Sequence, residues 1–326
     1  MKKVLIAILL LGLLPHASAD YIHWVDFRLS APVLRSALEL DMASQGGEQP
    51  LDWIDILALA AAWRGGTGVT VADTQRAAQV LRGDTPPERL PGMAGRCFSY
   101  YRAAYGAALG GLAGHFAIRR TDPQTGEAEW IPAYGLKAFS PIAAGYPWSH
   151  YPDFGAQRSY GYARPHLGND ILGALGTPIC AVEGGTVEAL GWNRYGGWRI
   201  GIRSDDRKRY YYYAHLRKDT PYAEGLAVGQ RVQAGDVIGF MGRTGYSAQE
   251  NVNNIETVHL HFGLQLIFDE SQKECDSEIW IDVYPIIELL ASHCSSVARD
   301  PQTGRWERLY PYCDLDAEPL RSAAAR

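Results

Sequence analysis

The chain has 326 residues, of which 47% are hydrophobic and 21% are charged, and these values are ordinary for a folded protein of one or two domains. Its formal net charge is −5 and it has no long basic run, which argues against nucleic acid as a partner. The composition therefore indicates a globular protein that does not bind nucleic acid.

Residues 1–19 have the pattern of a secretory signal peptide. "MKK" is a basic start, "VLIAILLLGLL" is an apolar run, and "ASA" before Asp20 is a small-residue cleavage site. The apolar run is too short to span a bilayer, which takes about 20 residues, and no later segment approaches that length. We therefore expect a soluble protein exported to the periplasm, cell wall or extracellular space, with no transmembrane segment after signal cleavage.

Residues 20–115 are predicted to be mainly helical. Four segments carry apolar residues at spacings of three and four, with breaks rich in glycine and proline between them: residues 30–43, 51–66, 71–83 and 96–114. We interpret the acidic residues Glu39, Asp41, Asp52 and Asp55 as solvated helix faces rather than as a catalytic carboxylate pair. No function is assigned to this region.

Short β-like segments follow the helical region. Residues 115–120 and 128–134 flank "TDPQTGE" and are predicted to form a hairpin within a linker at 116–145. From 146 to 290 short strands alternate with glycine turns, and only "IWIDVYPIIELLASH" near the end is predicted to contain a short helix. The predicted fold class is therefore α+β, with a helical region followed by a small antiparallel sheet, barrel or sandwich.

Residues 291–326 are predicted to form a hairpin around a second "DPQTG" turn, followed by a loose tail. Cys294 and Cys313 flank this hairpin, so a disulfide bridge between them is compatible with an exported protein. Cys180 lies in the buried-strand pattern "TPICAV" and is the candidate for a free thiol. Reduced thiols are the alternative, and the pairing of Cys97 and Cys275 also stays open.

One pair of ionisable side chains lies in "RPHLGND". His166 and Asp170 are four residues apart, and Pro165 and Gly168 disfavour a helix there. The pair is therefore predicted to lie on a strand or at a strand entry, with both groups on one face. Alone, such a pair is more often a surface or hydrogen-bonded pair than a metal site.

Three further histidines lie near the ends of predicted strands. His259 and His261 are two residues apart in "TVHLHFGLQL", a spacing that puts both on one strand face. A metal, a catalytic role or an exposed face would each account for them. His215 follows an aromatic run, and by itself we interpret it as a surface histidine. Two imidazoles and one carboxylate together make a zinc site with an open fourth position, beside which a further imidazole can move protons.

The chain resembles the lysostaphin-type (LytM-type) zinc metallopeptidases over roughly residues 150–285. "HLGND", "GTPICAVEGGTVEALG", "YYAHL", "GLAVGQRVQAGDVIGFMGRTGYS" and "HLHFGL" occur in the order of that family. The resemblance implies a small antiparallel β fold, zinc as the cofactor and peptidoglycan endopeptidase activity. It also implies that His166, Asp170 and His261 are the zinc ligands and that His215 and His259 are the catalytic histidines.

The chain departs from the family pattern at two places. "AQENVNNIETV", residues 248–258, is longer than the usual connection, so a longer loop is expected beside the groove. Gly263 stands where the family commonly has glutamate, which affects local hydrogen bonding rather than the metal. Neither departure removes a predicted ligand.

Aromatic residues are numerous around these motifs. We expect Trp192 and Tyr195 to line the groove, because "GWNRYGG" reads as a turn, whereas Trp198 and most of the tyrosines 210–213 are expected to be packing residues. Tyr160 and Tyr162 are candidates for donating a hydrogen bond to the oxyanion formed during attack.

The expected function is zinc-dependent cleavage of peptide bonds in bacterial peptidoglycan, with peptidoglycan peptides as the partner. The alternative is a non-catalytic peptidoglycan-binding or hydrolase-regulating protein on the same fold. A regulatory partner is also possible, because the helical region or the 248–258 loop would restrict the groove until moved. A surface insertion without effect fits that loop equally well.

Overall fold

The computed structural model describes residues 22–273 and 277–317. The predicted signal peptide, Cys275 and most of the predicted tail lie outside these residues. In the part of the chain that the structure describes, no helix has the length and apolar character needed to cross a membrane.

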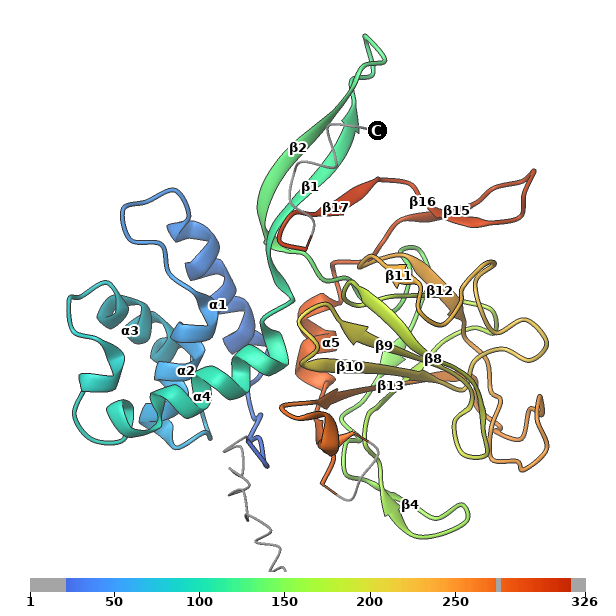
Figure 1. Cartoon of the computed structure of the whole chain (residues 1–326), viewed down its shortest axis with the longest axis horizontal. Coiled ribbons are helices and arrows are strands. Elements are labelled where there is room, and N and C mark those ends of the chain that lie inside the picture. The colour runs from blue at the N-terminus through green and yellow to red at the C-terminus, as the bar shows by residue number, and fades with distance from the viewer. Residues whose placement is uncertain (1–21, 274–276, 318–326) are drawn as a thin grey trace, which may run out of the picture.

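Helices form the N-terminal part of the molecule (Figure 1). They are α1 (Ala31–Ser44), α2 (Trp53–Arg64), α3 (Val71–Leu81), the 3₁₀ turn η1 (Pro87–Arg89) and α4 (Met93–Leu109). Each α-helix falls in one of the predicted segments to within a few residues. The most deeply buried is α2, which begins where the Asp52 side chain accepts the Ile54 N–H and ends at Gly65 with a φ of 63°.

Asp41 contradicts the expectation that the acidic residues of this region are all solvated. Its side chain is buried and accepts hydrogen bonds from the Trp53 N–H and the Tyr134 hydroxyl, both at 3.0 Å. These bonds connect α1 to the start of α2 and to β2 (Ala128–Leu136). A buried carboxylate that accepts several hydrogen bonds stabilises the fold, so Asp41 is still not interpreted as a catalytic group. The basis for this is its hydrogen bonding and not exposure to solvent.

The β region is built around one eight-stranded antiparallel sheet, in the order β11-β8-β9-β10-β13-β6-β3 with β14 paired to β13. Its strands are β3 (Ser149–His150), β6 (Asn169–Leu172), β8 (Gly185–Asn193), β9 (Gly197–Ser204), β10 (Arg209–Ala214), β11 (Arg231–Val232), β13 (His259–Leu266) and β14 (Ile279–Ile281). Two small ladders accompany it, β4 (Gln157–Arg158) with β5 (Arg164–Pro165) and β7 (Pro178–Cys180) with β12 (Val237–Phe240). After the 3₁₀ turn η2 (Glu270–Gln272), the predicted short helix is α5 (Tyr284–Leu290), and Cys180 is buried as expected.

A three-stranded sheet projects from the rest of the molecule in Figure 1. It pairs the predicted hairpin, β1 (Ala113–Thr121) and β2, with β17 (Tyr312–Asp314), while β15 (Val297–Arg299) and β16 (Trp306–Arg308) form the second predicted hairpin. Cys313 therefore lies opposite Ala117 of β1, whereas Cys294 follows α5 and donates to the carbonyl of Ala291 at 3.4 Å. The Cys294–Cys313 bridge is not formed, because the chain leaves the hairpin to join β1.

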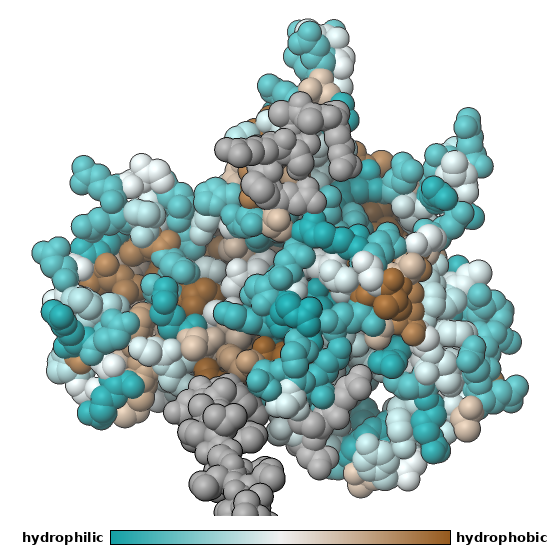
Figure 2. Space-filling model, viewed as in Figure 1, coloured by the Kyte–Doolittle hydropathy of each residue, from teal (hydrophilic) through white to brown (hydrophobic). Residues whose placement is uncertain are grey.

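The helical part docks on one end of β10. The guanidinium of Arg209 is buried, donates to the carbonyl of Ala107 in α4 (2.7 Å) and pairs with Glu183 (2.7 Å). On the face shown in Figure 2, hydrophilic residues cover most of the surface and apolar residues are visible among the helices. The other end of β10 leads to His215, so the strand connects the helical docking surface to a cluster of histidines.

Candidate metal centre

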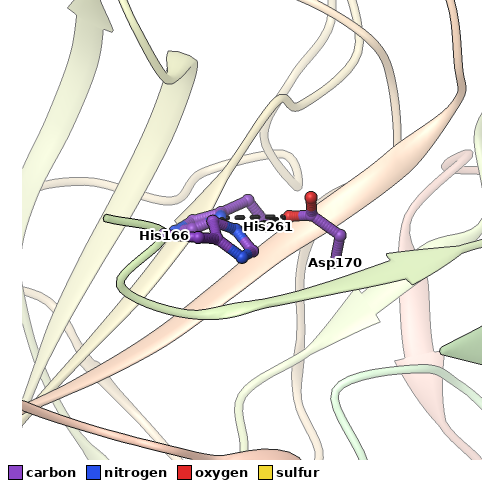
Figure 3. A group of neighbouring side chains, drawn as sticks. All are labelled: His166, Asp170 and His261. Carbon is purple, nitrogen blue, oxygen red and sulfur yellow. Dashed lines mark hydrogen bonds and ion pairs between the residues drawn. The ribbon is translucent and has the colours of Figure 1, made fainter. Parts of the chain in front are cut away.

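Three predicted ligands come together at the ends of two paired strands (Figure 3). His166 directly follows β5, Asp170 lies in β6, and His261 lies in β13 opposite Asp170 in the ladder. On β13 the alternation of side chains puts Leu260 and Phe262 in the core, as predicted, and turns His261 to the other face. The strand register therefore positions a carboxylate and two imidazoles next to one another.

The distances within the triad fit a tetrahedral metal site. His166 Nε2 lies 2.8 Å from His261 Nδ1 and 3.0 Å from Asp170 Oδ1, and His261 Nδ1 lies 3.1 Å from the same oxygen. One ligand atom from each residue lies within 4.8 Å of the others. Zinc bonds of about 2.0–2.1 Å imply ligand atoms roughly 3.3 Å apart in a tetrahedron. A small outward movement of the three side chains would therefore fit a zinc ion.

Asp153 fixes the orientation of His166. His166 Nδ1 lies 3.1 Å from both the carbonyl oxygen and the Oδ2 of Asp153, which places the proton on Nδ1 and directs Nε2 into the triad. Burial disfavours the charged ring, yet the carboxylates of Asp153 and Asp170 raise the pKa of His166 to about 9. A metal ion would compete with this proton for Nε2, so binding is expected to release it.

Arg158 holds the carboxylates of Asp153 and Asp170 together. Its Nη2 lies 3.0 Å from Oδ2 of each. Because the guanidinium occupies Oδ2 of Asp170, Oδ1 remains directed at the two imidazoles. Although burial opposes it, hydrogen bonds from His166 and His261 hold the pKa of Asp170 well below its usual range, so this group is a carboxylate.

A chain of hydrogen bonds supports the triad from behind. Asn169 donates to Asp153 Oδ1 (2.9 Å) and lies 2.6 Å from the Nδ1 of His150, whose Nε2 lies 2.7 Å from Glu288. These residues, together with Asp153 and Arg158, were not singled out from the sequence. Asn169 adjoins Asp170 in "HLGND" and carried a weak signal, whereas Asp153, His150 and Glu288 stand at no informative spacing from the ligands.

His215 lies beside the triad, with its ring centroid 5.9 Å from that of His261. Its Nδ1 lies 2.9 Å from the carbonyl oxygen of Thr244, which fixes the proton on Nδ1 and leaves Nε2 as an acceptor. The interpretation of His215 alone as a surface residue was wrong: it is 6% exposed and has a φ of 61°. Burial lowers the pKa of His215 well below its usual value, so the ring is neutral at pH 7.

His259 has the same arrangement. Its Nδ1 lies 2.9 Å from the carbonyl oxygen of Thr257, and its Nε2 lies 3.8 Å from Asp170 Oδ1. The rings of His215 and His259 are 4.7 Å apart between centroids. The structure thus brings together all five residues that the resemblance singled out, and the two histidines outside the triad each hydrogen-bond a backbone carbonyl through Nδ1.

A cavity of about 290 Å³ opens over this cluster. Besides four of the five site residues, the residues lining it include Tyr195, Tyr210, Tyr212, Tyr246, Gln265 and Trp280. Such a groove, with aromatic walls and a few convergent polar groups, suits an extended peptide better than a small ion. The metal site is therefore accessible to a polymeric ligand.

The aromatic predictions hold for some residues only. Tyr195 lines the cavity as expected, but Trp192 does not, because its ring packs edge-on against Trp198 at 5.7 Å. Along β10 the expectation of packing holds for the buried residues Tyr211 and Tyr213. It is wrong for Tyr212, which faces the cavity, whereas Tyr210 on the same strand face is buried and also lines the cavity.

Neither tyrosine before His166 lines the cavity. Tyr160 stacks on Tyr246 at 4.5 Å, and Tyr246 in turn lies edge-on to His215 at 5.9 Å. Tyr162 is 55% exposed. A hydrogen bond from either hydroxyl to an oxyanion stays a prediction, and Tyr246 is the tyrosine nearest to His215 in this group.

The 248–258 loop is held beside the cavity and supplies none of its lining residues. Asn251 accepts hydrogen bonds from Trp198 Nε1 and from the Asp219 N–H, both at 2.9 Å. Asn254 donates to the carbonyl of Tyr246 at 2.6 Å. These bonds tie the loop to the rim, so its polar side chains do not approach the open side of the triad here.

The antiparallel sheet with this triad and two facing histidines is the arrangement of a metallopeptidase domain. Residues 164–274 match the model of peptidase family M23. The L-Ala–D-Glu endopeptidase of Bacillus subtilis (strain 168) is 40% identical over 130 residues, which cover 40% of this chain and 38% of that protein. Lysostaphin of Staphylococcus simulans is 37% identical over 98 residues, which cover 30% of this chain and 17% of lysostaphin.

The matched segment thus spans less than two fifths of either relative. Among solved structures, a LytM protein of Ruminococcus gnavus is 24% identical, with 82% of this chain and 91% of that chain covered and a TM-score of 0.49. The match to the family model accordingly lies within the β region.

Proposed function

We propose that this protein is a zinc-dependent endopeptidase that cuts peptide bonds of bacterial peptidoglycan outside the cytoplasmic membrane. The observation that carries the proposal is the triad of His166, Asp170 and His261 beside the imidazole rings of His215 and His259. Relatives named as endopeptidases of L-Ala–D-Glu and glycyl-glycine bonds support peptidoglycan peptides as the substrate.

His166 Nε2, Asp170 Oδ1 and His261 Nδ1 would hold the zinc ion. The chemistry supplied by a bound zinc is that of a Lewis acid, which lowers the pKa of water and polarises a carbonyl group. Asp153 and Arg158 keep the donor atoms of His166 and Asp170 pointing at the site. The open fourth position of such a three-ligand site is what distinguishes a catalytic from a structural zinc.

His215 and His259 handle the proton. Because each donates its Nδ1 proton to a backbone carbonyl, each Nε2 is free to accept a proton from an attacking water. The ring that has taken the proton would then donate it to the leaving amine, and the other histidine would stabilise the developing oxyanion in its protonated form.

The test is cleavage of purified peptidoglycan by the mature protein, followed by detection of new amino termini. Zinc-loaded protein should release them, while chelation or His261→Ala should abolish the release. His115→Ala is a matched control, because this histidine lies on β1 with a side chain that is 64% exposed. Activity that survives chelation or the His261 substitution would rule the proposal out.

Metal analysis separates this proposal from the non-catalytic alternative. About one zinc per chain is expected for the enzyme, because the three donor atoms are already preorganised. Absence of zinc together with retained peptidoglycan binding would favour a binding or regulatory protein. The three intact ligand positions favour the enzyme.

A further inference from the structure

The lining of the cavity has a different charge balance from the chain. Four cationic side chains line it, those of Arg158, Arg164, Arg199 and Lys273, against the two carboxylates of Asp170 and Glu278. The chain as a whole has a net charge of −5. A groove lined by cations attracts anionic ligands even when the protein as a whole is acidic.

Three of the four cations already have partners. Arg158 is bound by the two carboxylates described above, Arg164 donates to the carbonyl of Tyr160 at 2.6 Å, and Lys273 pairs with Glu188 at 2.5 Å. Glu278 is also engaged, because one of its oxygens accepts the indole N–H of the neighbouring tryptophan at 2.7 Å. These groups therefore have structural partners in the absence of a substrate.

Arg199 is the exception. Within the described residues its guanidinium has neither a hydrogen-bond nor an ion-pair partner, and its Nε is buried without one. The side chain is half-buried and lines the cavity. A partly desolvated guanidinium with an unsatisfied donor carries a free-energy penalty, so its retention at this position calls for a ligand that satisfies it.

The register of the sheet places Arg199 in line with the metal site. Ala214 pairs with His261 on one side, and on the other side Tyr213 pairs with Ile200, so that Arg199 comes opposite Ala214. Arg199, Ala214 and His261 therefore form one row across three neighbouring strands. Two strand spacings put the Cα atoms of Arg199 and His261 roughly 10 Å apart, and both residues line the same cavity, whereas Ala214 between them is buried.

We propose that Arg199 binds a carboxylate of the substrate peptide and that the groove therefore selects acidic stem peptides of peptidoglycan over uncharged glycine bridges. The inference rests on the proposed function and adds the substrate class. An extended peptide advances about 3.3 Å per residue, so the carboxylate lies within about three residues of the scissile bond. A γ-linked glutamyl residue, which retains its α-carboxylate, has the required chemistry. A guanidinium recognises such a group through two parallel hydrogen bonds.

The experiment uses the zinc-loaded mature chain and three synthetic substrates: a stem peptide with free carboxylates, the same peptide with every carboxylate amidated, and pentaglycine. Wild type should cleave the free-carboxylate peptide best. Arg199→Gln should raise its KM by roughly 10- to 100-fold, the change expected for loss of a charge-assisted hydrogen bond, and should leave the amidated peptide unaffected. Arg199→Lys should fall between, because an ammonium keeps the charge but loses the paired geometry.

Arg305→Gln is the matched control, since this arginine also carries one charge but lies 59% exposed on the C-terminal hairpin. Equal cleavage of free and amidated peptides by wild type, or an equal effect of Arg199→Gln on both, would overturn the inference. If no substrate is cut, calorimetric titration of the same peptides still decides. Carboxylate-dependent binding that Arg199→Gln abolishes would support the subsite while the proposed catalysis fails, and absence of binding would overturn both.

Discussion

The two ends of β10 (Arg209–Ala214) both lie beside buried ionisable side chains, but these side chains are used differently. At one end Arg209 is satisfied by Glu183, by Asp206 and by carbonyl groups of α4, and Tyr211 donates to Glu183 at 2.6 Å. At the other end His215 and the triad adjoin a cavity, and His215 and His259 use only Nδ1 for a hydrogen bond to a backbone carbonyl. At the closed end, the network around Arg209, the polar groups have partners and stabilise a docking surface. At the open end, the triad with His215 and His259, polar groups remain available to bind and react.

This difference changes the expectation for α1–α4. No described residue of the helical region lines the cavity, because the region docks at the end of β10 remote from His215. A truncation that removes residues 20–140 would expose Arg209 and Glu183 rather than open the groove. In this structure neither the helical region nor the 248–258 loop restricts access to the triad, so restriction by either would require a different conformation.

The largest expected effect is on catalysis and comes from a substitution at the open end, beside the triad. His215→Ala should lower kcat/KM for peptidoglycan cleavage by roughly 10²- to 10⁴-fold, the usual contribution of a proton-transferring residue. Its zinc content should stay at the wild-type value, because His215 is not one of the three ligands. Steady-state kinetics and metal analysis of the same preparation check both. Loss of zinc together with activity would assign His215 a structural role instead.

A substitution at the closed end, in the Arg209 network, should instead lower stability and leave catalysis unchanged. Arg209→Ala leaves Glu183 buried without its cationic partner, which is expected to cost about 3–5 kcal/mol of unfolding free energy. Zinc content and kcat of the folded fraction should change little. Denaturant unfolding measures the unfolding free energy, and steady-state kinetics measures kcat. Arg231→Ala is the comparison variant, because its pair with Asp205 is about one third exposed and should contribute at most about 1 kcal/mol.

The sequence predicted the open end better than the closed one. The His–Asp and His–x–His spacings already indicated strand faces, and the order of the motifs indicated which faces meet. Each helix and both hairpins were also recognisable from apolar spacing and the "DPQTG" turns. These features are local, so a single segment of sequence carries them.

The remainder depends on contacts between distant segments. Nothing near Arg209 in the sequence indicates that it reaches the carbonyl of Ala107, about a hundred residues earlier. Asp153 and His150 support the triad through single hydrogen bonds that have no characteristic spacing. Whether Cys313 meets Cys294 or joins β1 likewise depends on tertiary packing, which composition and turn signals do not determine.

Asp153 contacts His166 of the triad without being one of the three predicted ligands. Asp153→Asn keeps the size of the side chain but weakens the acceptor for His166 Nδ1 and the pair with Arg158. Zinc affinity should fall by roughly 10- to 100-fold, as for other residues that orient a metal ligand. Competition with a chromogenic chelator measures it. Asp300→Asn, in the exposed second "DPQTG" turn, is the control, and equal affinities for the two variants would contradict the positioning role.

The smallest expected effect is a pH dependence of the closed end. Burial alone would raise the pKa of Asp206, but Arg209 and hydrogen bonds from Ser204 and the Lys208 N–H hold that pKa below its usual value. A lowered folded-state pKa means that the stabilisation is present above the unfolded value of about 3.9 and is lost as the pH falls through the folded value. The Asp206 side chain is 42% exposed, so its contribution at pH 7 should not exceed about 1 kcal/mol.

Asp206→Asn should accordingly be less stable than wild type at pH 7, and the two proteins should converge as the pH is lowered below about 4. Urea unfolding at a series of pH values measures the difference. Combining the substitution with Arg209→Ala provides the decisive comparison, because Asp206 should lose most of its stabilising effect once its cationic partner is absent. A difference that persists at low pH, or one that is unchanged without Arg209, would mean that Asp206 stabilises the turn through Ser204 and Lys208 alone.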